Sequence, residues 1–119
     1  MSTEHDDQTN AAYPALSLDG RQSNGAFPNY RNGGMVHIRA YPGMQPGQKV
    51  EFEMRTKDGE FPETFGRTTV KTFDTIVFEV SGTNLTRLHN IMHAWKMYYT
   101  VDGTRSNELI VYLSAGGPL

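Results

Sequence analysis

The chain of 119 residues contains no cysteine, which excludes a disulfide framework and any chemistry that depends on a thiolate. Its 11 Lys and Arg residues are balanced by 13 Asp and Glu residues, and the net charge is −2. This balance gives no electrostatic reason to bind DNA or RNA, so we expect no nucleic-acid partner. The length suits one domain of ordinary size.

Long apolar segments are also missing. A membrane-spanning helix needs roughly 18 consecutive apolar residues, and no segment approaches that length, so we expect no membrane insertion. The N-terminal sequence MSTEHDDQTNAAYPAL has neither a basic start nor an apolar core, so we expect no secretory signal peptide there. Two locations stay open: the cytoplasm, and the cell exterior reached by a route that reads no such signal.

A helical repeat is the third absence, because no window of a dozen residues repeats its apolar positions every 3.6 residues. The segment KVEFEMRT instead places Val50, Phe52 and Met54 alternately with charged residues, which predicts a half-buried antiparallel strand. About seven such strands, separated by turns rich in Gly, Pro and Asn, predict an all-β sandwich or barrel. Residues 82–90 are the one place where we expect a helical turn.

Composition divides the chain into two parts. Residues 1–13 are polar, and we expect a disordered tail there. Residues 14–119 hold all the predicted strands and form the single domain. We expect it to be a Greek-key β-sandwich of about seven antiparallel strands.

The last two predicted strands, 91–101 and 108–114, include the only tryptophan of the chain. Alternation places Trp95 and Tyr99 on the same face as Met97 and Val101. An antiparallel register that pairs Val101 with Leu109, Tyr99 with Val111 and Met97 with Leu113 buries the large apolar residues together. We therefore expect Trp95 and Tyr99 in the core.

The same register sets Tyr98 opposite Tyr112 on the outer face of the sheet, beside Lys96. Cross-strand aromatic pairs stabilise sheets by about 0.2–1 kcal/mol, which is one explanation for them. The other is a flat aromatic surface for a sugar or a protein partner, with the two tyrosines at its centre and Lys96 at its rim. The alternative surface lies in the loops formed by residues 21–34 and 57–63.

Signals of catalysis and metal binding are weak. His89 and His93 have the four-residue spacing of a helical zinc pair, but no third His or Cys follows them and the Glu of an H-E-x-x-H pattern is missing. Glu51 and Glu53 lie about 7 Å apart along one strand, a separation compatible with glycosidase carboxylates, yet alternating charge on a solvated face explains them as well. We expect no enzyme, no metal and no cofactor.

Three segments resemble the immunoglobulin-like modules of long, repetitive surface proteins from Pseudomonas and related bacteria. These are the turn YPGMQPGQ, the strand ending FEV and the closing sequence YYTVDGTRSNELIVYL. The resemblance extends from Pro14 to Leu113, and Gln48 stands where those modules usually have Asp. It implies a bacterial immunoglobulin-like sandwich without catalytic residues.

The expected function is therefore binding: an adhesion or recognition module, or a small secreted interaction protein. Two alternatives stay open. One is a lectin-like domain that binds carbohydrate through the exposed tyrosines, and the other is a structural subunit that forms homo-oligomers through its edge strands. The partner would be a protein or a glycan.

Overall fold

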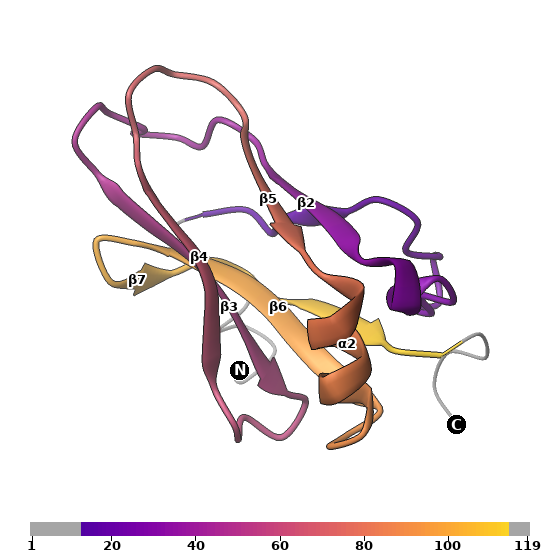
Figure 1. Ribbon diagram of the computed structural model, residues 1–119. Helices are drawn as coiled ribbons and strands as arrows, with labels where there is room; N and C mark the ends of the chain where they lie inside the picture. Colours follow the sequence, from indigo (N-terminus) through magenta and orange to yellow (C-terminus); the bar gives the residue numbers. More distant parts are fainter. Residues whose placement is uncertain (1–12, 115–119) are drawn as a thin grey trace, which may run out of the picture.

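The structure is a computed structural model that describes residues 13–114, and it folds into two antiparallel β-sheets packed face to face (Figure 1). The smaller sheet has the order β1-β2-β5 and the larger has the order β4-β3-β6, with β7 and β8 both paired to the far side of β6. The strands are β1 (Ser17–Leu18), β2 (Gly34–Ile38), β3 (Lys49–Thr56), β4 (Glu63–Thr69), β5 (Ile76–Val80), β6 (Ala94–Val101), β7 (Thr104–Arg105) and β8 (Leu109–Tyr112). The predicted all-β sandwich is confirmed, with eight strands among the described residues.

The strand order follows the immunoglobulin-type Greek key. In that fold the first, second and fifth strands share one sheet, and the third, sixth and seventh share the other. Here β1, β2 and β5 form the first group, while β3, β6 and β8 belong to the second. The fourth strand, β4, pairs with β3 and not with β5, so the smaller sheet has only three strands.

One short α-helix, α2 (Gly82–His89), connects β5 to β6, where the sequence predicts a helical turn. Ser81 caps the helix, because its hydroxyl accepts a hydrogen bond from the Asn84 backbone N–H at 3.1 Å. Eight residues are too few for a stable isolated helix. Burial of Leu85 and Leu88 against the sandwich supplies the remaining stability. A 3-10 turn, η1 (Tyr30–Asn32), packs against α2.

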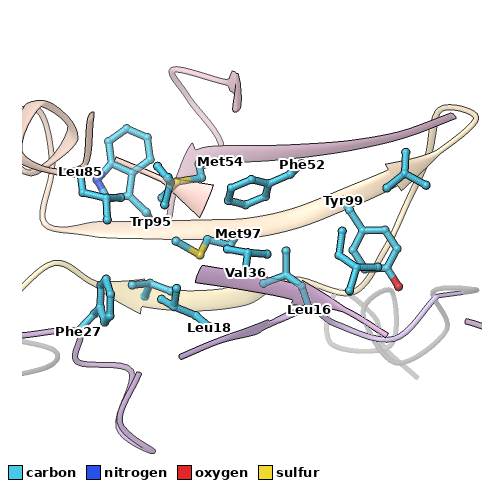
Figure 2. Packing of buried hydrophobic residues seen from close by; sticks show 14 of the residues in the cluster. Leu16, Leu18, Phe27, Val36, Phe52, Met54, Leu85, Trp95, Met97 and Tyr99 are labelled. Carbon is cyan, nitrogen blue, oxygen red and sulfur yellow. The ribbon is translucent and has the colours of Figure 1, made fainter. Parts of the chain in front are cut away.

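The core lies between the two sheets, and Figure 2 shows Trp95 and Tyr99 within it. Both residues are fully buried, as the alternation in β6 predicts. Their polar atoms have partners at the margins of the core: Trp95 Nε1 donates to the Met92 carbonyl at 2.8 Å, and the Tyr99 hydroxyl donates to the Pro14 carbonyl at 2.7 Å. Buried aromatic residues with polar atoms require such partners.

The expected register of the final hairpin is wrong, although the faces of its residues are right. Asp102 and Gly103 form a two-residue turn, with φ of +48° and +90°, and Val101 therefore pairs with Thr104. Asp-Gly is a favoured sequence for such a turn, because both positions need positive φ. The chain does not form the longer connection that a Val101–Leu109 pair requires.

A one-residue shift then restores the buried face. If the turn alone set the register, Leu109 would lie opposite Lys96, on the outer face. The structure instead pairs Leu109 with Met97 and Val111 with Trp95, because one extra residue enters the strand between β7 and β8. Ser106 stabilises this irregularity: its N–H donates to the Tyr99 carbonyl at 2.8 Å, and its hydroxyl accepts from the Tyr99 N–H at 3.0 Å.

The start of the described chain is anchored near the same irregularity. The Asn107 N–H donates to the Tyr13 carbonyl at 3.0 Å, and the Tyr13 ring lies 5.0 Å from the ring of Tyr41. Tyr13, the last residue of the expected tail, therefore packs on the domain. Residues 1–12 and 115–119, which include the rest of the expected tail, lie outside the described residues.

Candidate functional site

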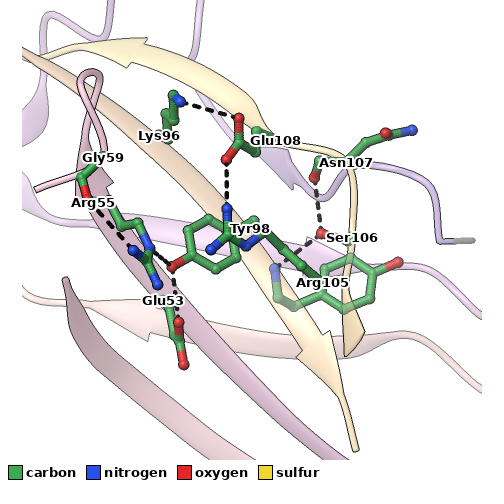
Figure 3. Close-up of polar contacts among 10 residues, drawn as sticks. Glu53, Arg55, Gly59, Lys96, Tyr98, Arg105, Ser106, Asn107 and Glu108 are labelled. Carbon is green, nitrogen blue, oxygen red and sulfur yellow. Dashed lines mark hydrogen bonds and ion pairs between the residues drawn. The ribbon is translucent and has the colours of Figure 1, made fainter. Parts of the chain in front are cut away.

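Tyr98 lies on the outer face of the larger sheet, as predicted, but it is not exposed. Its side chain is fully buried, because the guanidinium groups of Arg55 and Arg105 lie over its ring, with their central carbons 5.7 and 4.6 Å from the ring centroid (Figure 3). Arg55 comes from β3, while Arg105 comes from β7 directly after the tight turn. Alternation within β6 does not predict this cover, because the long side chains reach Tyr98 from neighbouring strands.

The Tyr98 hydroxyl takes part in a closed polar network. It donates to Glu53 Oε1 at 2.8 Å and accepts from Arg55 Nε, while Arg105 Nη1 lies 3.2 Å from Glu108 Oε2. Burial raises the pKa of Tyr98, and the hydrogen bond from Arg55 opposes that rise. The hydrogen bond to Tyr98 in turn raises the pKa of Arg55. The network therefore holds a neutral phenol, and no face of the Tyr98 ring is available to a sugar.

Lys96 and Tyr112, the other two candidate residues, do not complete a platform. Lys96 Nζ lies 3.4 Å from Glu108 Oε1. Tyr112 pairs with Ala94, four residues before Tyr98 on β6, and its ring stacks on His93 with centroids 5.3 Å apart. The expectation that Tyr98 and Tyr112 face each other as an exposed pair is therefore wrong, because the tight turn moves β8 along β6.

The weaker catalytic and metal candidates are engaged in separate contacts. His89 stacks on Tyr30 with ring centroids 4.9 Å apart, so the two histidines lie on different tyrosines. Glu51 Oε2 lies 3.0 Å from Arg67 Nε. Within residues 13–114, no group of three or more His, Cys, Asp or Glu side chains is arranged to hold a metal ion.

A second surface lies at one end of the sandwich, where the β3–β4 loop and the α2–β6 loop lie side by side (Figure 1). We call it the α2 end and define it as residues 28–33, 57–62 and 81–93. Three large apolar side chains are exposed there: 57% of Phe61, 44% of Ile91 and 39% of Met92. Exposed apolar side chains that gather on one surface are typical of interaction sites.

Several contacts fix the loops of the α2 end to one another. Arg87 of α2 forms a bidentate ion pair with Glu63, with N–O distances of 3.1 and 2.6 Å. The Lys57 N–H donates to the Ala94 carbonyl at 3.0 Å, which extends the pairing of β3 and β6 into both loops. The stacking of His89 on Tyr30 joins α2 to the loop that precedes β2. The surface is thus largely formed in advance of any binding.

Phe61 has an unusual backbone at this surface. Its φ is +49°, in the left-handed region that a non-glycine residue occupies at a cost of about 1–3 kcal/mol. The residue is also the most exposed of the three apolar side chains, so burial of its own ring does not offset this cost. Strain combined with exposure is typical of residues that are kept for an interaction.

Only part of this surface is predicted from the sequence. The alternative loops, 21–34 and 57–63, contribute residues 28–33 and 57–62 to it, and the second loop carries Phe61. The predicted strand 91–101 includes Ile91 and Met92, but both residues lie in the connection that leaves α2. The sequence signal for this connection is Ser81, a favoured N-cap residue, followed by a short helical segment. A helix of two turns that starts there ends near Asn90, so Ile91 and Met92 come after it.

No protein-family model matches the chain, and no curated protein matches it significantly. Among the described residues, no helix is both long enough and apolar enough to cross a membrane.

Proposed function

We propose that this chain is a non-catalytic protein-recognition module that binds its partner through the α2 end. The observation that carries the proposal is the group of exposed apolar residues, Phe61, Ile91 and Met92, on loops held together by ion pairing and main-chain hydrogen bonds. Exposed aromatic and Met side chains are enriched in protein interfaces. Loops at the end of a sandwich are a usual binding surface.

The geometry favours a protein over a glycan as partner. A sugar needs a free aromatic face with polar groups beside it. Tyr98, the predicted centre of such a site, is covered by Arg55 and Arg105. The α2 end offers exposed aliphatic, thioether and phenyl side chains, which suit the apolar side chains of a peptide or protein. Interfaces of this kind derive most of their affinity from a few buried apolar residues.

The test uses peptides displayed on phage as the probe. A random peptide library is panned on the immobilised wild-type chain, and enriched clones are then measured on a triple variant, Phe61→Ser, Ile91→Ser and Met92→Ser. The control is Phe73→Ser, because Phe73 is 69% exposed but lies in the loop between β4 and β5, outside the α2 end.

Loss of more than about tenfold in affinity, or 1.4 kcal/mol, in the triple variant but not in Phe73→Ser supports the proposal. Equal binding to all three proteins places the site elsewhere. A glycan array is screened in parallel, and binding to glycans without enrichment of any peptide overturns the proposal in favour of a lectin.

A further inference from the structure

The two sides of the sandwich differ in how their sheets end. On one side the outer edge of β8 is covered by an earlier segment: Phe27 N–H donates to the Tyr112 carbonyl at 2.9 Å, and Tyr112 N–H donates to the Gly25 carbonyl at 2.8 Å. On the other side β4 and β5 are the marginal strands. Their outer edges have no main-chain partner within residues 13–114.

The direction of the main-chain groups in β5 follows from the pairing of β2. The Met35 carbonyl accepts from Asp19 N–H at 3.1 Å, so Met35 bonds toward β1. Because main-chain groups alternate in direction along a strand, Val36 bonds toward β5, where its partner is Phe78. Val77 and Glu79, on either side of Phe78, therefore direct their N–H and C=O groups outward.

The β5 edge has fewer of the features that block strand addition than the β4 edge has. β4 follows Pro62, contains Gly66 and Arg67, and has a register shift opposite Phe52 and Glu53. Such features protect edge strands from pairing with other chains. β5 has the sequence Ile-Val-Phe-Glu-Val, with Glu79 as its one charged residue and without Pro, Gly or a register shift. Its outward residue Val77 is 47% exposed.

We propose that two copies of this chain associate through antiparallel pairing of their β5 strands, with Phe78 of each copy at the two-fold axis. Val77 of one copy then lies opposite Glu79 of the other, and the outward main-chain groups of both residues are paired. The two three-stranded sheets become one sheet of six. This surface is separate from the α2 end, and the inference does not depend on the proposed function.

The alternative registers are less favourable. Pairing centred on Glu79 sets two carboxylates directly opposite each other, which is destabilising. Pairing centred on Val77 requires the Thr75 N–H, which already donates to Asp74 Oδ1 at 2.7 Å. Pairing centred on Phe78 avoids both problems, and it brings the two half-buried Phe78 rings together on the core side of the sheet.

Sedimentation equilibrium over a wide range of protein concentration tests the association. Val77→Pro removes one outward N–H from β5 and leaves the bonds between β2 and β5 intact. We expect the wild-type chain to dimerise, and Val77→Pro to raise the dissociation constant by about tenfold or more. The matched control is Thr69→Pro, at an outward position of β4, and we expect it to dimerise like the wild type.

Two further variants test the register. Val77→Lys sets a cation opposite Glu79 of the other copy and should tighten the dimer by about two- to fivefold, while Val77→Glu should weaken it by a similar factor. Circular dichroism checks that each variant is folded. A wild-type chain that stays monomeric overturns the proposal, and so does a dimer that Val77→Pro leaves unchanged. A dimer that responds equally to Lys and Glu contradicts the register.

Discussion

The contact between Gly66 and Phe78 gives a prediction that depends closely on the geometry. The Phe78 ring lies on the bare backbone of Gly66, where it closes the core between the marginal strands β4 and β5. A Cβ atom at position 66 would lie 2.7 Å from Phe78 Cε1, and still closer to Cδ1. Gly66 does not have positive φ, so Gly66→Ala introduces no left-handed backbone strain.

Two opposing terms set the expected magnitude. Forcing a methyl group into a packed contact costs about 1–3 kcal/mol, whereas Ala in a strand is more stable than Gly by about 0.5–1 kcal/mol. We therefore expect Gly66→Ala to lower the free energy of unfolding by about 1–2 kcal/mol. When Phe78 is first replaced by Ala, the steric term vanishes, and Gly66→Ala should then stabilise the protein by up to about 1 kcal/mol.

Urea unfolding of the wild type, the two single variants and the double variant forms a double-mutant cycle. The change of sign between the two backgrounds is the expected result. If Gly66→Ala has the same effect in both backgrounds, Phe78 does not rest on Gly66. A stabilising effect in the wild-type background contradicts the packing of this margin directly.

Three further predictions concern stability. Trp95→Ala should lower the free energy of unfolding by about 3–5 kcal/mol, because the ring is fully buried; a loss below about 1 kcal/mol in urea unfolding contradicts its place in the core. Tyr98→Phe should cost about 1–3 kcal/mol, because Glu53 and Arg55 lose their shared partner; unchanged stability in the same assay means that the network contributes nothing. Burial raises the pKa of Tyr41, Tyr98 and Tyr99 above the ordinary value of 10.0, which favours the neutral phenol in the native state. This stabilisation is complete below about pH 10 and is lost as the pH rises above it. The urea midpoint should therefore fall above that pH, and a constant midpoint contradicts the raised pKa values of these tyrosines.

The faces of the strands could be predicted from sequence, because alternation with period two decides which residues are buried. It placed Trp95 and Tyr99 correctly, and it placed Tyr98 on the outer face. Alternation cannot fix the position of one strand along another, since shifts by an even number of residues preserve every face. The turn at Asp102 and Gly103 fixes that position. The extra residue beside Ser106 then reconciles the turn with the buried face.

Whether an outward-facing side chain is exposed was harder to predict than the face on which it lies. Tyr98 faces outward, but two arginines from neighbouring strands cover it, and no pattern within β6 reveals them. The α2 end is similar, because Phe61 and Met92 are far apart in sequence. The hydrogen bond from Lys57 N–H to the Ala94 carbonyl sets the two connections that carry them beside each other.

The most direct test of the proposed recognition surface is an amide chemical-shift map. A peptide selected on the wild-type chain is titrated into the isotopically labelled protein, and its two-dimensional nitrogen–proton spectrum is recorded. The account predicts that the shifted amides belong to residues 28–33, 57–62 and 81–93, with the largest changes next to Phe61, Ile91 and Met92. Shifts centred on the outer face around Tyr98 and Arg105, with none at the α2 end, would contradict it.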